Sequence, residues 1–476
     1  MILEAPKHEC GVLGIFSKDK PVSQDLFYGL IALQNRGQEG SGIGVFTDDG
    51  QIRLHKERGL VHAVFGERDI DWLAGRIGIG HNRYGTTGSS SKENTQPYII
   101  SSDLGPFIIG HNGNVFNADE LRKRLEFEGM KFTSTSDSEV IAQLIATSPG
   151  DTFVEKIKTA APQLRGAYSL VLATKDSLVG VRDSHGIWPL SLGRINGTGY
   201  ILASETNALD KTGSKFIEDV APGTIITIDQ TGVQHDNLDR KQEALCSFEF
   251  YYFSDPASKL LGKRVENARF EMGKLLAREH PLDVDWVLPI PETARPAAEG
   301  YSCASKIPVR GALIRNRWLG RTFIEPSQRL REQAAELKYT PLAEIINGQR
   351  IVVIDDSIVR GTTTRRIVRL LKGAGASEVN VLITAPPIIR ECWFGVDTAD
   401  QTELIAAQFQ GKVDEIKQFI EADYLGYLSL EFGLQAIGPA LKNRVCTSCF
   451  TGSYPMQVPC KRDKFILERQ QVTQHA

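Results

Sequence analysis

The chain has 476 residues, of which 41% are hydrophobic and 24% are charged, and its formal net charge is −3. This length allows two or three domains with buried cores, and the composition is that of an ordinary globular protein. A net charge close to zero gives no support for a nucleic-acid or membrane-surface partner. The first residues, MILEAPKHEC, do not form a secretory signal, and no apolar run reaches the ~20 residues that a membrane span needs. We therefore expect a cytoplasmic protein.

The first half of the chain alternates short apolar runs with glycine and asparagine, a pattern typical of strands that end in turns. The predicted strands lie at residues 11–17, 41–46, 75–81, 107–113, 168–174 and 200–205. Two helices are expected between them, at residues 25–37 and 137–147. Strands interrupted by helices in this way predict an α+β layered domain.

A polar stretch at residues 236–244 marks the expected end of this first domain. Beyond it, helices alternate with single apolar strands, which predicts an α/β domain with a parallel sheet and crossover helices. The predicted helices lie at residues 265–280 and 363–376, and the strands at 285–290, 350–356 and 377–387. A polar tail follows Cys460 and is expected to be mobile.

Seven cysteines are scattered along the chain: Cys10, Cys246, Cys303, Cys392, Cys446, Cys449 and Cys460. An odd number of cysteines argues against a disulfide framework and favours catalytic or metal-binding thiols. Taken alone, Cys10 reads best as a small buried apolar residue. Cys446 and Cys449 form a C-x-x-C pair, which zinc, redox and iron–sulfur sites share.

The clearest chemistry lies in the segment RIVVIDDSIVRGTTTRRIVRLL. Residues 351–354 form a continuous apolar run, as a buried parallel strand does. Asp355 and Asp356 follow at the strand end, where open α/β sheets bind ligands. The next loop opens a helix with three threonines, whose hydroxyl and N–H groups can hold a phosphate. The two carboxylates can hold ribose hydroxyls, a hydrated Mg²⁺, or both. A helix cap would explain GTTT alone, but not the whole constellation.

This segment resembles the phosphoribosyl pyrophosphate (PRPP) signature of type I phosphoribosyltransferases, in the version carried by glutamine amidophosphoribosyltransferases. The resemblance implies that Asp355 and Asp356 meet the ribose hydroxyls and Mg²⁺. It also implies that Ser357 and the following loop bind PRPP, with the 5′-phosphate on the loop. The residues of that loop are Arg360, Gly361, Thr362, Thr363 and Thr364.

Two further segments resemble the same family. The segment DWVLPIPETARPAAEGY would place Thr293 near Mg²⁺ and pyrophosphate. The segment NRWLGRTFIEPSQRLREQ resembles a closing loop, in which Arg317, Arg321 and Arg331 would bind the pyrophosphate. A leaving pyrophosphate carries a large negative charge, and a lid of arginines that excludes water would stabilise it.

The first half resembles the N-terminal nucleophile glutamine amidotransferases, which have a layered αββα fold. The motifs that carry this resemblance are RGQEGSG at 36–42, HNRYGTTG at 81–88, HNGNVFN at 111–117 and TSDSE at 135–139. The resemblance implies that residues 1–9 are a propeptide whose removal leaves Cys10 at the N-terminus. The freed α-amine, with an ordinary pKa near ~8, could then act as the general base for its own thiol.

The same resemblance implies the roles of the other residues at this site. Cys10 would attack the side-chain amide of glutamine and release ammonia. Asn112 and the N–H group of Gly113 would hold the oxyanion. Arg83 would pair with the α-carboxylate of glutamine and Asp137 with its α-ammonium group, and Thr86 would also contact the substrate.

Four cysteines match the family members that carry a [4Fe–4S] cluster: Cys246, Cys392, Cys446 and Cys449. Four thiolates suit such a cluster, and a four-cysteine zinc site is the main competing interpretation. A cluster here would be structural, because the reaction transfers no electrons.

The chain departs from the usual family pattern at five positions. Ser184 stands where proline is usual, Trp188 where arginine is usual, and Gly85 where serine or alanine is common. In the closing-loop segment, Glu336 replaces a basic residue and Tyr339 replaces leucine. These changes bear on nucleotide feedback, on the coupling of the two sites, and on membership in housekeeping purine synthesis.

We therefore predict a propeptide at residues 1–9, a class II glutamine amidotransferase domain at 10–235, a phosphoribosyltransferase domain with a cluster-binding segment at 236–460, and a polar tail at 461–476. The expected reaction converts glutamine and PRPP to 5-phosphoribosylamine, glutamate and pyrophosphate, the first committed step of purine biosynthesis. Two alternatives are a paralogue that aminates another phosphorylated acceptor and a silent regulatory paralogue that binds PRPP. The resemblance also implies a homodimer or homotetramer.

Overall fold

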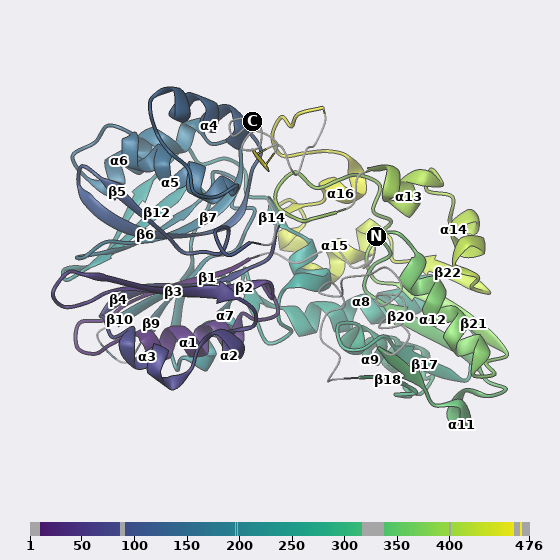
Figure 1. The fold of residues 1–476 in the computed structure, drawn as a ribbon. Helices are drawn as coiled ribbons and strands as arrows, with labels where there is room; N and C mark the ends of the chain where they lie inside the picture. Colours follow the sequence, from purple (N-terminus) through teal and green to yellow (C-terminus); the bar gives the residue numbers. More distant parts are fainter. Residues whose placement is uncertain are drawn as a thin grey trace.

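The computed structural model describes residues 10–85, 91–195, 197, 199–316, 338–398, 401–460 and 467–468. Two bodies lie side by side, an N-terminal one in purple to teal and a C-terminal one in green to yellow (Figure 1). Several predicted features lie outside the described residues. These are the propeptide, Thr86, the three arginines of the closing loop (Arg317, Arg321 and Arg331) and Glu336.

The N-terminal domain is built around two antiparallel sheets that face each other. The first has the strand order β11-β9-β10-β1-β4-β2-β3 and the second β13-β12-β8-β7-β6-β5. The strands of the first sheet are β1 (Gly11–Phe16), β2 (Gly40–Phe46), β3 (Ile52–Arg58), β4 (Ile77–Arg83), β9 (Ser191–Ile195), β10 (Gly199–Ala203) and β11 (Lys215–Asp219). Those of the second are β5 (Tyr98–Ser102), β6 (Gly105–Val115), β7 (Gly166–Ala173), β8 (Leu178–Arg182), β12 (Thr224–Asp229) and β13 (Gly232–Asn237).

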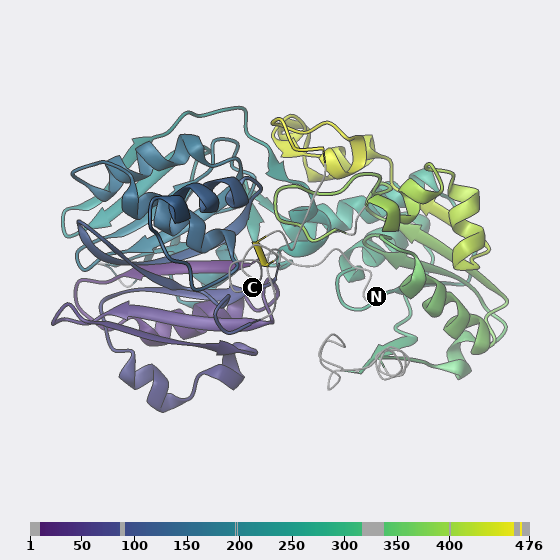
Figure 2. The same ribbon diagram turned by 45° about the horizontal axis from the view of Figure 1, so that its top comes forward.

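Helices cover the outer face of each sheet, which makes four layers (Figures 1 and 2). The first sheet carries α1 (Ser23–Ala32), α2 (Val61–Val64), α3 (Glu67–Trp72) and α7 (Thr206–Lys211). The second carries α4 (Ala118–Phe127), α5 (Asp137–Thr147) and α6 (Phe153–Ala160). This arrangement confirms the predicted αββα fold.

The strand alternation of β1 explains why the layers hold together. Val12 points into the core between the two sheets, whereas Leu13 points into the core beneath the helices of the first sheet. Both faces of this strand are therefore apolar and buried. The helix predicted at residues 25–37 is wrong at its end, because α1 stops at Ala32. The chain turns there, and Arg36 beyond the turn is completely buried.

The C-terminal domain has a parallel sheet of order β17-β20-β21-β22, as predicted. Its strands are β17 (Trp286–Pro289), β20 (Arg350–Asp355), β21 (Glu378–Ile383) and β22 (Tyr424–Tyr427). Val352 and Ile354 face one core and Ile351 and Val353 the other. The first core includes α8 (Val265–Glu279), α9 (Arg295–Ser305) and α15 (Leu430–Ile437), and the second α12 (Thr362–Gly373), α13 (Ile405–Gln408) and α14 (Val413–Ile420). Smaller elements are the pair β18 (Leu313–Arg315) and β19 (Tyr339–Pro341), and α11 (Ala343–Ile346).

The two domains are joined by a segment that begins with β14 (Leu245–Cys246) and continues into a π-helical turn, Glu249–Phe253. β14 pairs in parallel with β23 (Val445–Cys446), which precedes α16 (Ser448–Thr451) near the end of the chain. Leu467 is 1% exposed and packs in the core beneath the helices of the second sheet. The tail after Cys460 is therefore not wholly separate from the fold. The domain limits stay a prediction.

We predict that the helix pair α8 and α9 tolerates no side chain at Gly273. A Cβ atom there would lie 1.8 Å from the carbonyl oxygen of Ala297, so the helices would have to move apart. Gly273→Ala should lower the free energy of unfolding by about 1–3 kcal/mol, measured by urea denaturation. Gly373→Ala is the matched control, since a Cβ there meets no atom within 4 Å, and it should be neutral or stabilising by up to about 1 kcal/mol. Equal midpoints for the two variants would contradict the close packing.

Candidate active sites

Cys10 lies directly before β1 and is buried, with 5% of its surface exposed. The antiparallel register pairs Gly11 with Asn82, so the predicted nucleophile lies beside the end of β4. Its thiol donates to the carbonyl oxygen of Tyr84 at 3.4 Å, and the Tyr84 N–H group donates to the sulfur at 3.3 Å. Arg83, the predicted partner of the glutamine carboxylate, is the last residue of β4. It is 3% exposed and faces Glu39 at 3.6 Å.

The two sheets meet at this site through a hydrogen bond between their strands. His81 of β4 and the carbonyl oxygen of His111 of β6 lie 2.9 Å apart through the Nε2 atom of His81. The next residues of β6 are Asn112 and Gly113, the predicted oxyanion donors. The fold thus brings residues from β1, β4 and β6 to one place.

Asn112 is fully buried, and neither its amide oxygen nor its amide nitrogen has a hydrogen-bond partner among the described residues. A buried amide without partners is costly, because it has lost its contacts with water. Its neighbour Gly113 has φ +145°, and a Cβ atom there would lie 2.1 Å from the carbonyl oxygen of Ala167. Only glycine fits this backbone. An amide group without a hydrogen-bond partner among the described residues thus lies next to a backbone conformation that only glycine can adopt.

Asp137 is the first residue of α5 and is 3% exposed. Its carboxylate accepts the N–H group of Val115 at 3.0 Å and lies 3.9 Å from the His111 ring. Burial lowers the pKa of His111, so this ring favours its neutral form. Asp137 is thus a buried carboxylate held next to β6, consistent with a cationic ligand at that point.

The second predicted site lies at the carboxyl edge of the parallel sheet. Asp355 ends β20, and Asp356 follows it with 6% of its surface exposed. Burial and the neighbouring carboxylate raise the pKa of Asp355 well above its usual value. Burial also raises the pKa of Asp356 to about 6, against hydrogen bonds from Ser357 and Thr293 and the charge of Arg269. A carboxylate pair with so little countercharge suits a cation such as Mg²⁺.

The predicted phosphate loop follows these carboxylates and leads into α12. Gly361 has φ +78°, and a Cβ atom there would lie 2.5 Å from the side chain of Ile405. The turn at Gly361 leaves the first N–H groups of α12 directed along the helix axis, where they favour an anion. Arg360 donates to Glu403 from Nε at 3.1 Å and from Nη2 at 2.5 Å. Its guanidinium is therefore already shared with a carboxylate.

The four cysteines predicted to hold a cluster line one cavity, together with Trp188, Phe248 and Phe394. Cys246 and Cys446 lie opposite each other across the β14–β23 pair. Burial raises the pKa of the thiols of Cys246, Cys446 and Cys449. Within the described ranges, no set of three or more His, Cys, Asp or Glu side chains has the geometry to hold a metal ion as it stands. The thiols share a cavity but would have to draw inward around a metal.

Trp188, one of the departures from the family pattern, lies at this cavity and not at either substrate site. It is fully buried, and its indole N–H group donates to the carbonyl oxygen of Phe394 at 2.7 Å. The sequence identified Trp188 as a departure from the family pattern but did not predict that it lies at the cysteine cavity. Its hydrogen bond to Phe394 connects the N-terminal domain to the C-terminal domain.

Sequence reasoning missed two buried arginines, Arg36 and Arg269. Arg36 pairs with Glu205 and Glu249, which lie 169 and 213 residues away along the chain. Arg36 belongs to the RGQEGSG motif, but no local pattern indicates partners at that separation.

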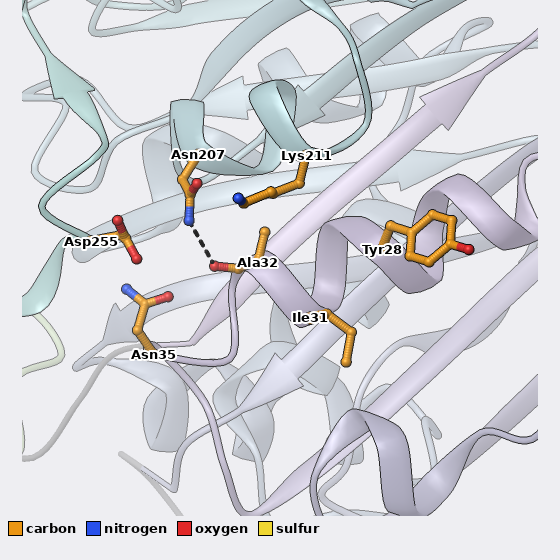
Figure 3. A pocket seen from close by; sticks show the side chains of 7 residues that line it. All are labelled: Tyr28, Ile31, Ala32, Asn35, Asn207, Lys211 and Asp255. Carbon is orange, nitrogen blue, oxygen red and sulfur yellow. Dashed lines mark hydrogen bonds between the residues drawn. The ribbon is translucent and has the colours of Figure 1, made fainter.

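A cavity of about 350 Å³ opens between α1 and α7 (Figure 3). Its walls are formed by Tyr28, Ile31, Ala32, Asn35, Asn207, Lys211 and Asp255. None of these residues was predicted to be functional. One of them, Asn35, directly precedes the buried Arg36 in the chain.

Comparison with known proteins gives one consistent result. A profile of the glutamine amidotransferase domain matches residues 81–211. The amidophosphoribosyltransferase of Synechocystis sp. is 43% identical over 473 residues, which cover 98% of this chain and 95% of that protein. That of Methanocaldococcus jannaschii is 44% identical over 469 residues, covering 94% and 98%. The solved structure of the glutamine PRPP amidotransferase of B. subtilis, complexed with ADP and GMP, matches with a TM-score of 0.88 at 40% identity, covering 95% and 98%.

None of the helices in the described part of the chain is long and apolar enough to cross a membrane.

The raised pKa of Asp356 predicts a pH-dependent cost to stability. The pKa of its carboxyl group is about 6 in the folded state, compared with the usual value of 3.8 in the unfolded state. Between these values the folded state binds more protons, so this group lowers the free energy of unfolding as pH rises. In EDTA and without PRPP, Asp356→Asn should stabilise the protein by roughly 1–3 kcal/mol at pH 7 and by much less at pH 4.5.

Urea denaturation at the two pH values measures this effect. Asp414→Asn is the control, because that carboxylate is 89% exposed and should show little change at either pH. An equal gain for Asp356→Asn at both pH values would contradict the assigned cause.

Proposed function

The chain belongs to the amidophosphoribosyltransferase family, and on that premise we propose which residues carry out each step of the reaction. Enzymes of this family use glutamine as the nitrogen donor and PRPP as the acceptor, and form 5-phosphoribosylamine, glutamate and pyrophosphate. This is the first committed step of de novo purine biosynthesis. Two chemical steps are needed, the release of ammonia from glutamine and the displacement of pyrophosphate by that ammonia.

Cys10 is the nucleophile of the first step. Once residues 1–9 are removed, its own α-amine takes the thiol proton, and the sulfur attacks the amide carbon of glutamine. The tetrahedral adduct collapses to a γ-glutamyl thioester and ammonia, and water then hydrolyses the thioester to glutamate. Arg83 binds the α-carboxylate of glutamine, and Asp137 binds its α-ammonium group.

The observation that carries this assignment is the unpartnered amide of Asn112. Its nitrogen is fully buried and has no acceptor in the described ranges, so it can donate to an oxyanion that forms beside it. The N–H group of Gly113 supplies a second donor from the backbone. Donors that are already in place stabilise developing charge without the cost of reorganising during the reaction.

The second step takes place at the carboxyl edge of the parallel sheet. Asp355 and Asp356 hold the ribose hydroxyls, Ser357 and the loop from Arg360 to Thr364 hold the 5′-phosphate, and ammonia attacks the anomeric carbon as pyrophosphate leaves. Mg²⁺ bound with Thr293 and the two aspartates would neutralise charge on the pyrophosphate. Arg317 and Arg321 are proposed to bind that leaving group.

The cysteine cavity is proposed to hold a structural [4Fe–4S] cluster. Cys246 is buried and the other three cysteines are partly buried in a cavity with apolar side chains. The surroundings raise the pKa of the Cys246, Cys446 and Cys449 thiols, so their ionised form is disfavoured unless a cation compensates. When bound, the cluster would link the C-terminal segment to the domain junction. A four-cysteine zinc site has the same donor set and is the second candidate.

The alternative of a silent regulatory paralogue is disfavoured by the intact Cys10, Asp355 and Asp356. The cytoplasmic location and the homodimeric or homotetrameric assembly stay predictions.

Cys10→Ala should separate the two steps. We expect glutamine-dependent pyrophosphate release to fall at least about 10³-fold, because the nucleophile is gone, while ammonia-dependent release stays within about twofold. Cys303→Ala is the control, since that thiol is exposed and should support both activities. Intact mass should show that residues 1–9 are removed in the wild type and kept in Cys10→Ala. Normal use of glutamine by Cys10→Ala would overturn the assignment.

Iron analysis tests the cluster. Protein purified without oxygen should contain about four iron atoms per chain, and Cys392→Ser should lose this iron and unfold at a lower temperature. Cys460→Ser should keep its iron, because that thiol is exposed and does not line the cavity. One zinc atom per chain in place of iron would establish the competing site.

A further inference from the structure

One edge of the second sheet changes partner just before the proposed oxyanion donors. Strand β6 pairs with β5 up to Ile109, which lies opposite Tyr98. The residue before Tyr98 is Pro97, which has no N–H group and cannot continue the ladder. On its other edge, β6 stays paired with β7 beyond this point, through His111 and Asn112. The edge that β5 leaves therefore needs another partner at His111.

The side chain of Gln96 supplies that partner. It is 4% exposed, and its Oε1 atom accepts the N–H group of His111 at 2.8 Å. Its Nε2 atom donates to the carbonyl oxygen of His111 at 3.3 Å. A side-chain amide offers an acceptor and a donor, as a peptide group does. Gln96 thus bonds the backbone of His111 in the way that a neighbouring strand would.

This support lies one residue before Asn112. The Asn112 side chain has no hydrogen-bond partner among the described residues, so its direction depends on the backbone of β6. That backbone is held by β7 on one edge and by Gln96 on the other. The N–H group of Gly113 belongs to the same stretch. Gln96 therefore helps to set where both proposed oxyanion donors point.

The same amide also reaches the helix that carries Asp137. The Nε2 atom of Gln96 donates to the Oγ atom of Ser138 at 3.1 Å, and Ser138 follows Asp137 in the first turn of α5. The Oγ atom of Ser138 also lies 2.9 Å from Nδ1 of His111. Gln96, His111 and Ser138 thus form a closed triangle of hydrogen bonds between β6 and α5.

The backbone around Gln96 is itself held by other parts of the domain. Lys56 of β3 donates to the carbonyl oxygens of the residues on either side of Gln96. Asn94, which is 1% exposed, accepts the N–H group of Thr135 and donates to its hydroxyl group, each at 2.9 Å. Thr135 lies just before α5. The amide of Gln96 therefore extends from a segment that is fixed to the first sheet and to the start of α5.

We propose that Gln96 is a positioning residue of the glutamine reaction, which aligns the oxyanion donors of β6 with the ammonium-binding carboxylate of Asp137. The proposal rests on the proposed roles of Cys10, Asn112, Gly113 and Asp137. A glutamine held by Asp137 presents its amide carbonyl to the oxyanion donors only when β6 and α5 keep their spacing. A displacement of about 1 Å at a reacting centre can cost about 10²-fold in rate, so a buried amide can control this step without touching the substrate.

Gln96→Met tests the proposal, because it keeps a similar volume and removes all three hydrogen bonds. With PRPP and Mg²⁺ present, three rates are measured: glutamate release from glutamine, ammonia-dependent pyrophosphate release, and alkylation of Cys10 by iodoacetamide, followed by mass spectrometry. We expect kcat for glutamate release to fall at least about 30-fold and KM for glutamine to rise at least about threefold, since the oxyanion donors and Asp137 both lose their support. The other two rates depend on neither group and should stay within about twofold.

Asn117→Leu is the matched control. Asn117 is 8% exposed, and its amide likewise bonds backbone, accepting the N–H group of Arg165 and donating to the carbonyl oxygen of Gln163, each at 2.9 Å. These bonds reach no residue assigned to the glutamine reaction. Both kcat and KM for glutamine should therefore stay within about twofold of the wild type.

Gln96→Glu is the conservative variant. It keeps the acceptor for the N–H group of His111 and loses at least one of the two donated bonds, so its kcat should lie between those of Gln96→Met and the wild type.

Wild-type kcat and KM for glutamine in Gln96→Met would overturn the proposal, as would an equal loss in Asn117→Leu or a parallel loss of Cys10 alkylation. If Gln96→Met does not fold, wild-type glutamine kinetics in Gln96→Glu would overturn it in the same way. Failure of the proposed function would show differently, as a wild type that releases no glutamate from glutamine.

Discussion

The fully buried guanidinium of Arg36 is the interaction on which the arrangement of the two halves depends. A charged group out of water is tolerated only when its partners are fixed around it. Here the partners are a carboxylate from each side of the junction and the carbonyl group of Cys10. The end of α1, the π-helical turn and the start of β1 each position a group that takes part in these bonds. Cys10, the proposed nucleophile, and the domain interface therefore share Arg36 and cannot change independently.

Both proposed substrate sites contain polar groups that the fold buries without full compensation. The Asn112 amide lacks partners in the described structure, and the Asp355–Asp356 pair is held with raised pKa values. Each feature costs folding free energy, and each is satisfied by the ligand that the site is proposed to bind. This agrees with the general finding that strained or unsatisfied groups gather where function requires them.

Elements with strong local patterns could be predicted from the sequence. The run 351–354, the two aspartates and the Gly–Thr loop specify a strand, a turn and a helix within about twenty residues, and β20 and α12 confirm them. The four cysteines were grouped only through the family resemblance, and the fold brings them to one cavity. The buried ion pairs of Arg36 were not predicted, because its carboxylate partners Glu205 and Glu249 lie 169 and 213 residues away along the chain. Trp188 was identified as unusual, yet its contact with Phe394 depends on how the domains pack.

The contacts that close the junction also order events during synthesis on the ribosome. Glu243 binds Arg444, which lies 201 residues later, and β14 has to wait for β23 from the same late segment. At about 5–20 residues per second, the first half of the junction is exposed for on the order of 10–40 s before its partner emerges. Leu467, which fills the core of the first domain, arrives later still. The N-terminal domain is made first, but its last core residue is supplied from the end of the chain.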